Sequence, residues 1–159
     1  MRVLFLICFF ACETLYAVSL TVNLAGDSTA TGTFNLATLS GDLRGCLNYI
    51  NSQSVATTYN VNFALNAGNE TITLPGQLLP PINLARANTV IIDGSNLSGS
   101  GTMITINGNN VQRGFFFVQG TGTLQNINIV NAIAKGDEKI QALILLDKLK
   151  ISGCKDTKG

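Results

Sequence analysis

Two neighbouring stretches of this chain share one layout, and this repeated unit restricts the fold more than any other feature. Residues 88–96 contain Thr-Val-Ile-Ile followed by Asp-Gly, and residues 102–110 contain Met-Ile-Thr-Ile followed by Asn-Gly. β-Branched residues favour strands, and Asx-Gly pairs favour turns. About ten residues separate Ile92 from Met103, whereas a tight hairpin needs roughly two. The repeat therefore predicts stacked coils of parallel strands rather than hairpins.

Short apolar runs of the same kind recur through the middle of the chain. Each is strongly β-forming and bounded by Gly, Pro, Asn or Asp, and their spacing suits either a sandwich or a solenoid. Asn is abundant beside the runs, where amide ladders can satisfy the corners of stacked coils, and prolines lie between the runs. We therefore predict an all-β solenoid with one continuous core. The runs are 61–65, 71–74, 82–84, 89–92, 103–106, 115–118 and 124–130.

One helix is predicted at 42–52, ahead of these runs. Its apolar residues fall at i, i+3, i+4 and i+7, and Ser40 or Asp42 is expected to cap it. The helix would cover the open end of the sheet stack together with a half-buried strand at 19–24. Residues 18–60 are thus the predicted N-terminal cap, and 61–134 the coils. The expected apolar stripe is Leu43, Cys46, Leu47 and Ile50, with Arg44, Asn48 and Asn51 facing away.

The N-terminus has the layout of an export signal. Residues 1–17 comprise a positive start, an apolar stretch and a small residue, Ala17, suited to cleavage. A membrane-spanning helix needs roughly 20 apolar residues, and this stretch is shorter. The alternatives are a buried N-terminal strand or helix, or lipid modification at Cys12. Cleavage would remove Cys8 and Cys12, leaving Cys46, interpreted as a small core residue, and Cys154. We expect no disulfide framework.

Charge is distributed very unevenly. Every lysine lies at or after Lys135, and residues 18–134 are nearly uncharged and rich in Asn, Thr, Gly and aliphatic residues. Nucleic-acid binding requires a basic face, so that class is excluded. The ample apolar content argues against disorder.

Six motifs together carry a resemblance to a known family: Leu-Arg-Gly-Cys-Leu at 43–47, Thr-Ile-Thr-Leu-Pro at 71–75, Ile-Ile-Asp-Gly at 91–94, Ile-Thr-Ile-Asn-Gly at 104–108, Gly-Phe-Phe-Phe-Val at 114–118 and Asn-Ile-Asn-Ile-Val at 126–130. Residues 20–136 are similar to the N-terminal part of bacterial right-handed β-helix, pectate-lyase-like surface proteins. These include autotransporter passenger domains and polymorphic-outer-membrane-like proteins of environmental chlamydiae. The resemblance implies a right-handed parallel β-helix capped by the helix.

The resemblance also implies location and role. It implies an exported, adhesin-like protein that is either secreted or held at the bacterial cell surface or outer membrane. No catalytic activity is expected. The implied partner is a glycan or protein of the host-cell surface or matrix. Neither nucleic acid nor a small-molecule cofactor is expected. Membrane association would occur only through a missing C-terminal part.

Residues 135–159 depart from the family in composition. They are lysine-rich, and 140–151 form a helix-like or amphipathic run. One hypothesis is a frame shift or gene break near residue 136, which would leave a truncated, periplasmic or nonfunctional product. The alternative is a native short protein with a C-terminal capping helix, because solenoids need a polar cap.

Candidate catalytic groups are few. Glycoside hydrolysis needs two carboxylates facing one bond, whereas Asp27, Asp42, Glu70 and Asp93 are scattered over separate loops. Gly-Asp-Ser at 26–28 is interpreted as an Asx-turn loop, since the chain has no histidine to activate a serine. Asp93 is interpreted as turn-forming. No catalytic or metal site is therefore predicted, and a fragment of a carbohydrate-active, pectate-lyase-like enzyme is the alternative function.

Three consecutive phenylalanines form the last candidate feature. In a strand, Phe115 and Phe117 would share one face and Phe116 the other. We interpret Phe115 and Phe117 as residues that stack in the core. An exposed Phe116 is a weak candidate for contact with a glycan or protein.

Overall fold

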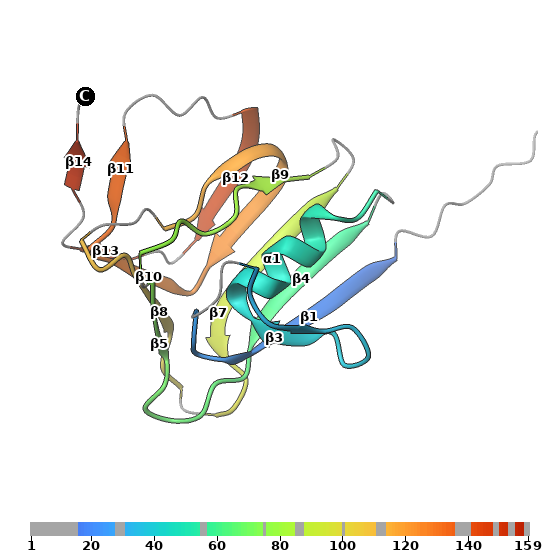
Figure 1. Ribbon diagram of the computed structural model, residues 1–159, viewed down its shortest axis with the longest axis horizontal. Helices are drawn as coiled ribbons and strands as arrows, with labels where there is room; N and C mark the ends of the chain where they lie inside the picture. The colour runs from blue at the N-terminus through green and yellow to red at the C-terminus, as the bar shows by residue number, and fades with distance from the viewer. Residues whose placement is uncertain are drawn as a thin grey trace, which may run out of the picture.

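The computed structural model confirms the all-β class. Among the residues that it describes, strands β1 to β14 accompany one helix, α1, which is too short to cross a membrane (Figure 1). The predicted export signal lies almost wholly outside the described residues. Side chains are described as far as residue 133. The described residues are 16–27, 31–54, 57–74, 76–84, 88–99, 101–110, 114–135, 141–147, 150–152 and 155–157.

The largest sheet contains a series of parallel strands stacked in chain order. Each pairs with the next in register, so residues from successive strands form columns. One column joins Leu20, Val61, Ile92, Leu124 and Leu146. Register of this kind places one apolar residue above another. The strands are β1 (Ala17–Leu24), β4 (Thr58–Phe63), β7 (Thr89–Asn96), β9 (Phe117–Gln125) and β12 (Gln141–Asp147).

A second sheet repeats this arrangement with shorter strands. Its register forms a column of Ile72, Ile106, Ile129 and Ile151. A third pair is parallel as well. The second sheet contains β5 (Thr71–Thr73), β8 (Ile104–Asn107), β10 (Ile127–Val130) and β13 (Lys150–Ser152); β11 (Ile133–Lys135) pairs with β14 (Lys155–Thr157), and β6 (Ile82–Asn83) with β9.

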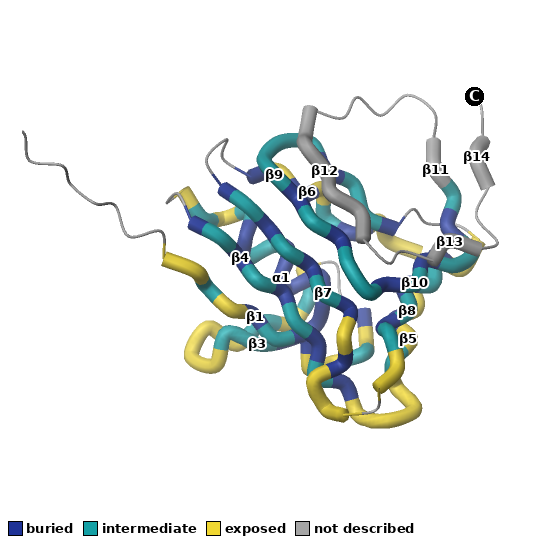
Figure 2. Tube along the Cα trace, turned by 180° about the vertical axis from the view of Figure 1, so that it is seen from behind, coloured by how far each residue is buried: buried dark blue, intermediate teal, exposed yellow. Residues whose placement is uncertain are grey.

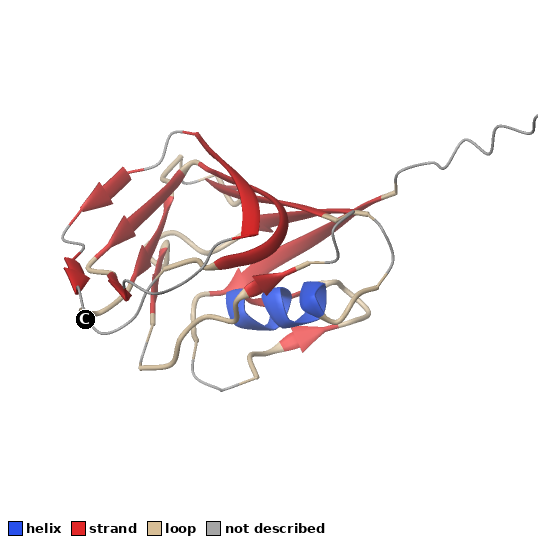
Figure 3. Cartoon of the chain, turned by 90° about the horizontal axis from the view of Figure 1, so that it is seen from above, coloured by secondary structure: helices blue, strands red, loops and turns tan. Residues whose placement is uncertain are grey.

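The β1 end of the large sheet carries a small cap. Strand β3 (Ser40–Asp42) extends the sheet beside β1, and β2 (Phe34–Asn35) pairs antiparallel with β3. Helix α1 (Leu43–Asn51) follows directly, lies within the predicted segment and contacts β1, β2, β3 and β6. Figure 3 shows the helix alongside the strands.

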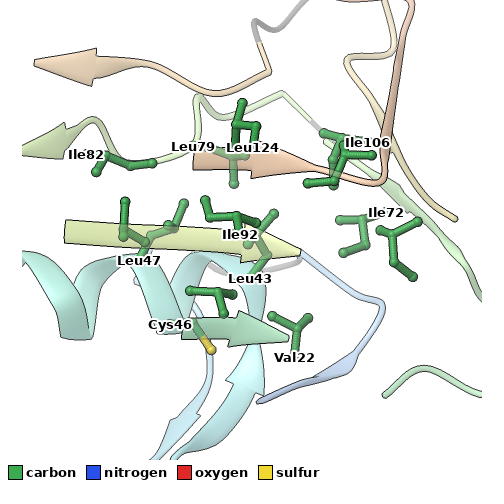
Figure 4. Close-up of a cluster of buried hydrophobic side chains, with 14 of the residues drawn as sticks. Val22, Leu43, Cys46, Leu47, Ile72, Leu79, Ile82, Ile92, Ile106 and Leu124 are labelled. Carbon is green, nitrogen blue, oxygen red and sulfur yellow. The ribbon is translucent and has the colours of Figure 1, made fainter. Parts of the chain in front are cut away.

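The predicted apolar stripe of α1 packs into one core shared with both sheets. Along β4 and β7, buried residues alternate with more exposed ones, so each strand contributes one face to the interior. Leu43, Leu47 and Cys46 project from α1 toward Val22 and Ile92 (Figure 4). Figure 2 shows the buried segments running along successive strands.

The C-terminal segment corrects one prediction. Residues 140–151 were expected to be helix-like, but β12 occupies Gln141–Asp147 and β13 begins at Lys150. A short apolar run suits a buried strand as well as a helix. The edge of β9 decides between them, because its backbone donors and acceptors pair with β12 from Gln119 to Gln125.

Some of the predicted strand boundaries were also wrong. The run 124–130 was expected to be continuous, yet it divides at Asn126, whose φ is 54°. This left-handed residue turns the chain so that Leu124 and Ile127, three positions apart, are both buried. Asp93 and Gly94 do not end their strand. Instead they lie in an irregularity of β7, where Asp93 pairs with Asn62 and Asn96 with Phe63.

Candidate functional site

Asp93 forms a hydrogen-bonded centre on β7. Its Oδ1 accepts bonds from the Ser95 amide at 2.9 Å and from Asn126 Nδ2 at 2.8 Å. Its Oδ2 accepts from Gln125 Nε2 at 2.8 Å. The Asx turn to Ser95 agrees with the predicted turn role, and the side chains of Gln125 and Asn126 link β7 to the end of β9. The carboxylate is thus already engaged by donors within the sheet.

These donors control the pKa of Asp93. Partial burial would raise the pKa, but hydrogen bonds from Asn126, from Ser95 and from Gln125 outweigh it, so the pKa lies below its ordinary value of 3.8. A depressed pKa means that the ionised carboxylate stabilises the fold fully above 3.8. This contribution is lost as pH falls through the folded-state pKa.

Asp93→Asn tests this arrangement. At neutral pH we expect it to lower the free energy of unfolding by about 1–2 kcal/mol, because charged hydrogen bonds become neutral ones. Urea unfolding of both proteins over a pH series measures the difference. The difference should shrink below pH 3.8. A difference that stays constant on acidification would contradict the charged role.

Arg44 corrects the prediction that it faces away from the core. Its residue exposure is 3% and that of Asp27 is 5%. Nε and Nη2 donate to the two carboxylate oxygens of Asp27 at 2.5 and 2.7 Å. Nη1 donates to the Leu78 carbonyl at 2.6 Å and Nη2 to the Gln77 carbonyl at 3.0 Å. The guanidinium therefore joins α1 to two chain segments, and Asp27 is an ion-pair partner rather than a simple loop residue.

Asp42 is the N-cap of α1, one of the two predicted caps. Its Oδ1 accepts from the Gly45 amide at 2.7 Å and Oδ2 from the Thr33 amide at 2.7 Å. Its own backbone amide donates to the Thr33 carbonyl at 2.9 Å. One side chain thus starts the helix and holds the preceding loop against it.

Side-chain amides form hydrogen bonds with backbone groups at several loops and strand ends. Asn96 donates to the Leu65 carbonyl at 2.8 Å and accepts from the Leu65 amide at 3.0 Å. Asn88 accepts from the Thr57 amide at 3.0 Å. Asn51, expected to face away from the helix core, accepts from the Asn83 amide and donates to the Pro81 carbonyl. The abundance of Asn beside the strands predicted amide hydrogen bonds in general, but not these pairs.

Cys46 is the predicted small core residue and is a free, fully buried thiol. Burial, with a smaller contribution from nearby Asp42, raises its pKa from 9.0 to about 12. The thiolate is the reactive form, so at pH 8 only about one thiol in ten thousand is reactive. The other cysteines lie outside the described residues or side chains.

Alkylation tests this environment. We expect Cys46 in the native protein at pH 8 to react with iodoacetamide at least ~100-fold more slowly than in urea. Peptide mass spectrometry resolves Cys46 from the other cysteines. Because its folded pKa is raised, the stability it contributes should fall between pH 9 and about 12. Equal rates in both states would contradict its burial.

The predicted strand at 115–118 is wrong in its first half, because β9 begins at Phe117, and the phenylalanines therefore divide as predicted only in part. Phe117 is buried, and Phe115 is half-buried against the core. Phe116 is half-buried, and its carbonyl accepts a bond from the Ile82 amide at 2.7 Å. A binding role for Phe116 remains a prediction.

An open groove lies in the cap between the end of β1 and the β2–β3 hairpin. Its volume is about 410 Å³. Phe34 lines it and stacks on Tyr49, with ring centroids 4.7 Å apart and an interplanar angle of 20°. Thr38 and Ser40 share a hydroxyl hydrogen bond of 2.8 Å. The motifs singled out in the sequence do not include this groove, because its residues converge only through the hairpin.

Comparison with protein-family models, curated proteins and solved structures gave no significant match. Within the described part of the chain, His, Cys, Asp and Glu do not gather into groups that could hold a metal ion. The buried Asp27, the N-cap Asp42 and the partly buried Asp93 all lie in separate hydrogen-bond networks.

Proposed function

We propose that this chain is an exported, surface-exposed and non-enzymatic protein, adhesin-like, whose described residues form the capped N-terminal end of a right-handed parallel β-helix. The observation that carries the proposal is the recurrence of parallel strands in chain order in both sheets. From β4 onward, strands of the large sheet (β4, β7, β9 and β12) alternate along the chain with strands of the second sheet (β5, β8, β10 and β13), which supports a solenoid.

The cap and the carboxylates support the same function. Helix α1 packs against β1, β2, β3 and β6, and the β2–β3 hairpin extends the sheet beyond β1, an arrangement that supports a cap at the start of the stack. The two most buried carboxylates, Asp27 and Asp42, are occupied by Arg44 and by backbone amides. Such engaged groups are poorly placed to serve as an acid and base pair.

Fractionation of the source organism tests the proposed location. We expect the protein in the envelope or medium, with an N-terminus at Val18 by mass spectrometry, and loss of the intact chain when whole cells are treated with protease. Recovery only in the cytoplasm with Met1 intact would contradict export.

Display on a carrier cell tests adhesion. Binding to host cells or matrix above the level of an empty carrier is expected, and equal binding would contradict adhesion without bearing on the fold. The rival function is tested separately with acidic polysaccharides. Release of unsaturated products would overturn the non-enzymatic proposal.

A further inference from the structure

We propose that the cap groove binds a neutral oligosaccharide through Phe34, Thr38, Ser40 and their neighbours. This inference rests on the proposed binding function and assigns it to one site. The groove is open, so it suits one or two sugar units of an extended chain rather than a fully enclosed small molecule. Its place at the capped end leaves the stacked coils unobstructed.

The chemistry of the lining selects the ligand class. None of the eight described residues that line the groove is ionisable. Their side chains provide hydroxyl and amide groups beside two apolar surfaces, Phe34 and Leu24, of which Leu24 is 45% exposed. A sugar ring presents hydroxyls at its edge and C–H groups on its face, which match amides and an aromatic ring. Acidic polysaccharides would find no cationic partner in this lining.

The polar groups are held in place before a ligand arrives. The Asn35 side-chain oxygen accepts from the Ala37 amide at 2.9 Å, which orients its amide nitrogen as a donor. Thr38 Oγ1 and Ser40 Oγ lie 2.8 Å apart. Each hydroxyl still has capacity for a further bond. Preorganised donors reduce the entropy lost on binding.

Tyr49 supports the apolar side of the site. Its ring stacks on one side of Phe34, and Phe34 also packs against the core. Phe34 is therefore a poor position for a first substitution, since its loss would disturb folding. Thr38 is exposed in the hairpin and permits a change at the groove alone. Thr73, exposed on β5 in the other sheet, is the matched control.

Titration of the ¹⁵N-labelled chain with cellohexaose, mannohexaose and chitohexaose tests the proposal, with polygalacturonate as the acidic comparator. At least one neutral oligosaccharide should shift amide signals of 23–24 and 33–41. Thr38→Val should weaken binding about 3- to 10-fold, since it removes one hydroxyl hydrogen bond and keeps the shape. Thr73→Val should bind like the original chain.

Several results would contradict the proposal that the cap groove binds a neutral oligosaccharide. They are no shift with any neutral oligosaccharide at millimolar concentration, shifts confined to other residues, unchanged binding by Thr38→Val, or binding of polygalacturonate alone. Cell adhesion of the displayed chain separates this failure from that of the proposed function. If the displayed chain adheres but the groove signals do not shift, the groove proposal is wrong and the adhesin proposal stands. If the groove signals shift but the chain does not adhere, the adhesin proposal is wrong and the groove proposal stands.

Discussion

Replacing Asp27 by asparagine should lower the free energy of unfolding by about 3–5 kcal/mol, because it leaves a buried guanidinium without its counter-charge. Asparagine retains the size of the side chain and one acceptor. However, Arg44 is 3% exposed and would keep only the Gln77 and Leu78 carbonyls together with a neutral amide. Urea unfolding followed by circular dichroism measures the change.

Two further variants separate charge from packing. Arg44→Met combined with Asp27→Asn removes both charges, and it should be less destabilising than Asp27→Asn alone, since no buried charge is left unpaired. Arg44→Lys retains the charge but cannot form the forked contact with Asp27. Its free energy of unfolding should therefore lie between those of the original chain and of Asp27→Asn. If Asp27→Asn lowered the free energy of unfolding by less than about 1 kcal/mol, Arg44 would not depend on the charge of Asp27.

Gly45→Ala should destabilise the protein by about 2–3 kcal/mol, opposite to the usual effect of this change within a helix. A Cβ at Gly45 would lie 2.3 Å from the Thr33 carbonyl oxygen and 2.7 Å from its carbon. Both are backbone atoms, held because the Thr33 amide donates to Asp42. Relieving the overlap would therefore break the contact between the loop and the N-cap.

Gly26→Ala is the matched control, because a Cβ there meets no heavy atom within 4 Å. Its stability should stay within about 0.5 kcal/mol of the original. Thermal and urea unfolding of both variants provide the comparison. If Gly45→Ala raised the midpoint, helix propensity would outweigh the overlap, and the close approach of the loop to α1 would be wrong.

The features predictable from sequence share a local origin. The stripe on α1 follows from apolar residues at helical spacing, and burial of Cys46 follows from its place in that stripe. The β-forming runs 61–65 and 89–92 were predicted as strands, and their residues Val61 and Ile92 are buried in β4 and β7. Asp93 followed by Gly94 indicated an Asx turn, which the Ser95 amide completes. Each depends on neighbours within a few positions of the chain.

The features missed depend on partners far away in sequence. Arg44 lies on the polar side of an isolated helix pattern, yet Asp27 and the carbonyls of Gln77 and Leu78 surround it. The cap groove joins the end of β1 at Leu24 to a hairpin that begins ten positions later at Phe34. Neither could be found from local periodicity, because the pattern records which face is apolar and not which polar group will meet it.

The sequence by itself therefore determined that this chain is rich in β-strands, that one amphipathic helix precedes most of them and that Asx residues form turns beside them. Only the tertiary structure decided that residues 141–147 form a strand, that Asn126 divides an apolar run and that Arg44 is buried. The physical reason is that local preferences differ by less than the energy of an unpaired backbone group or an unpaired buried charge. Partners brought together by stacking therefore determine the conformation where local preferences leave it open.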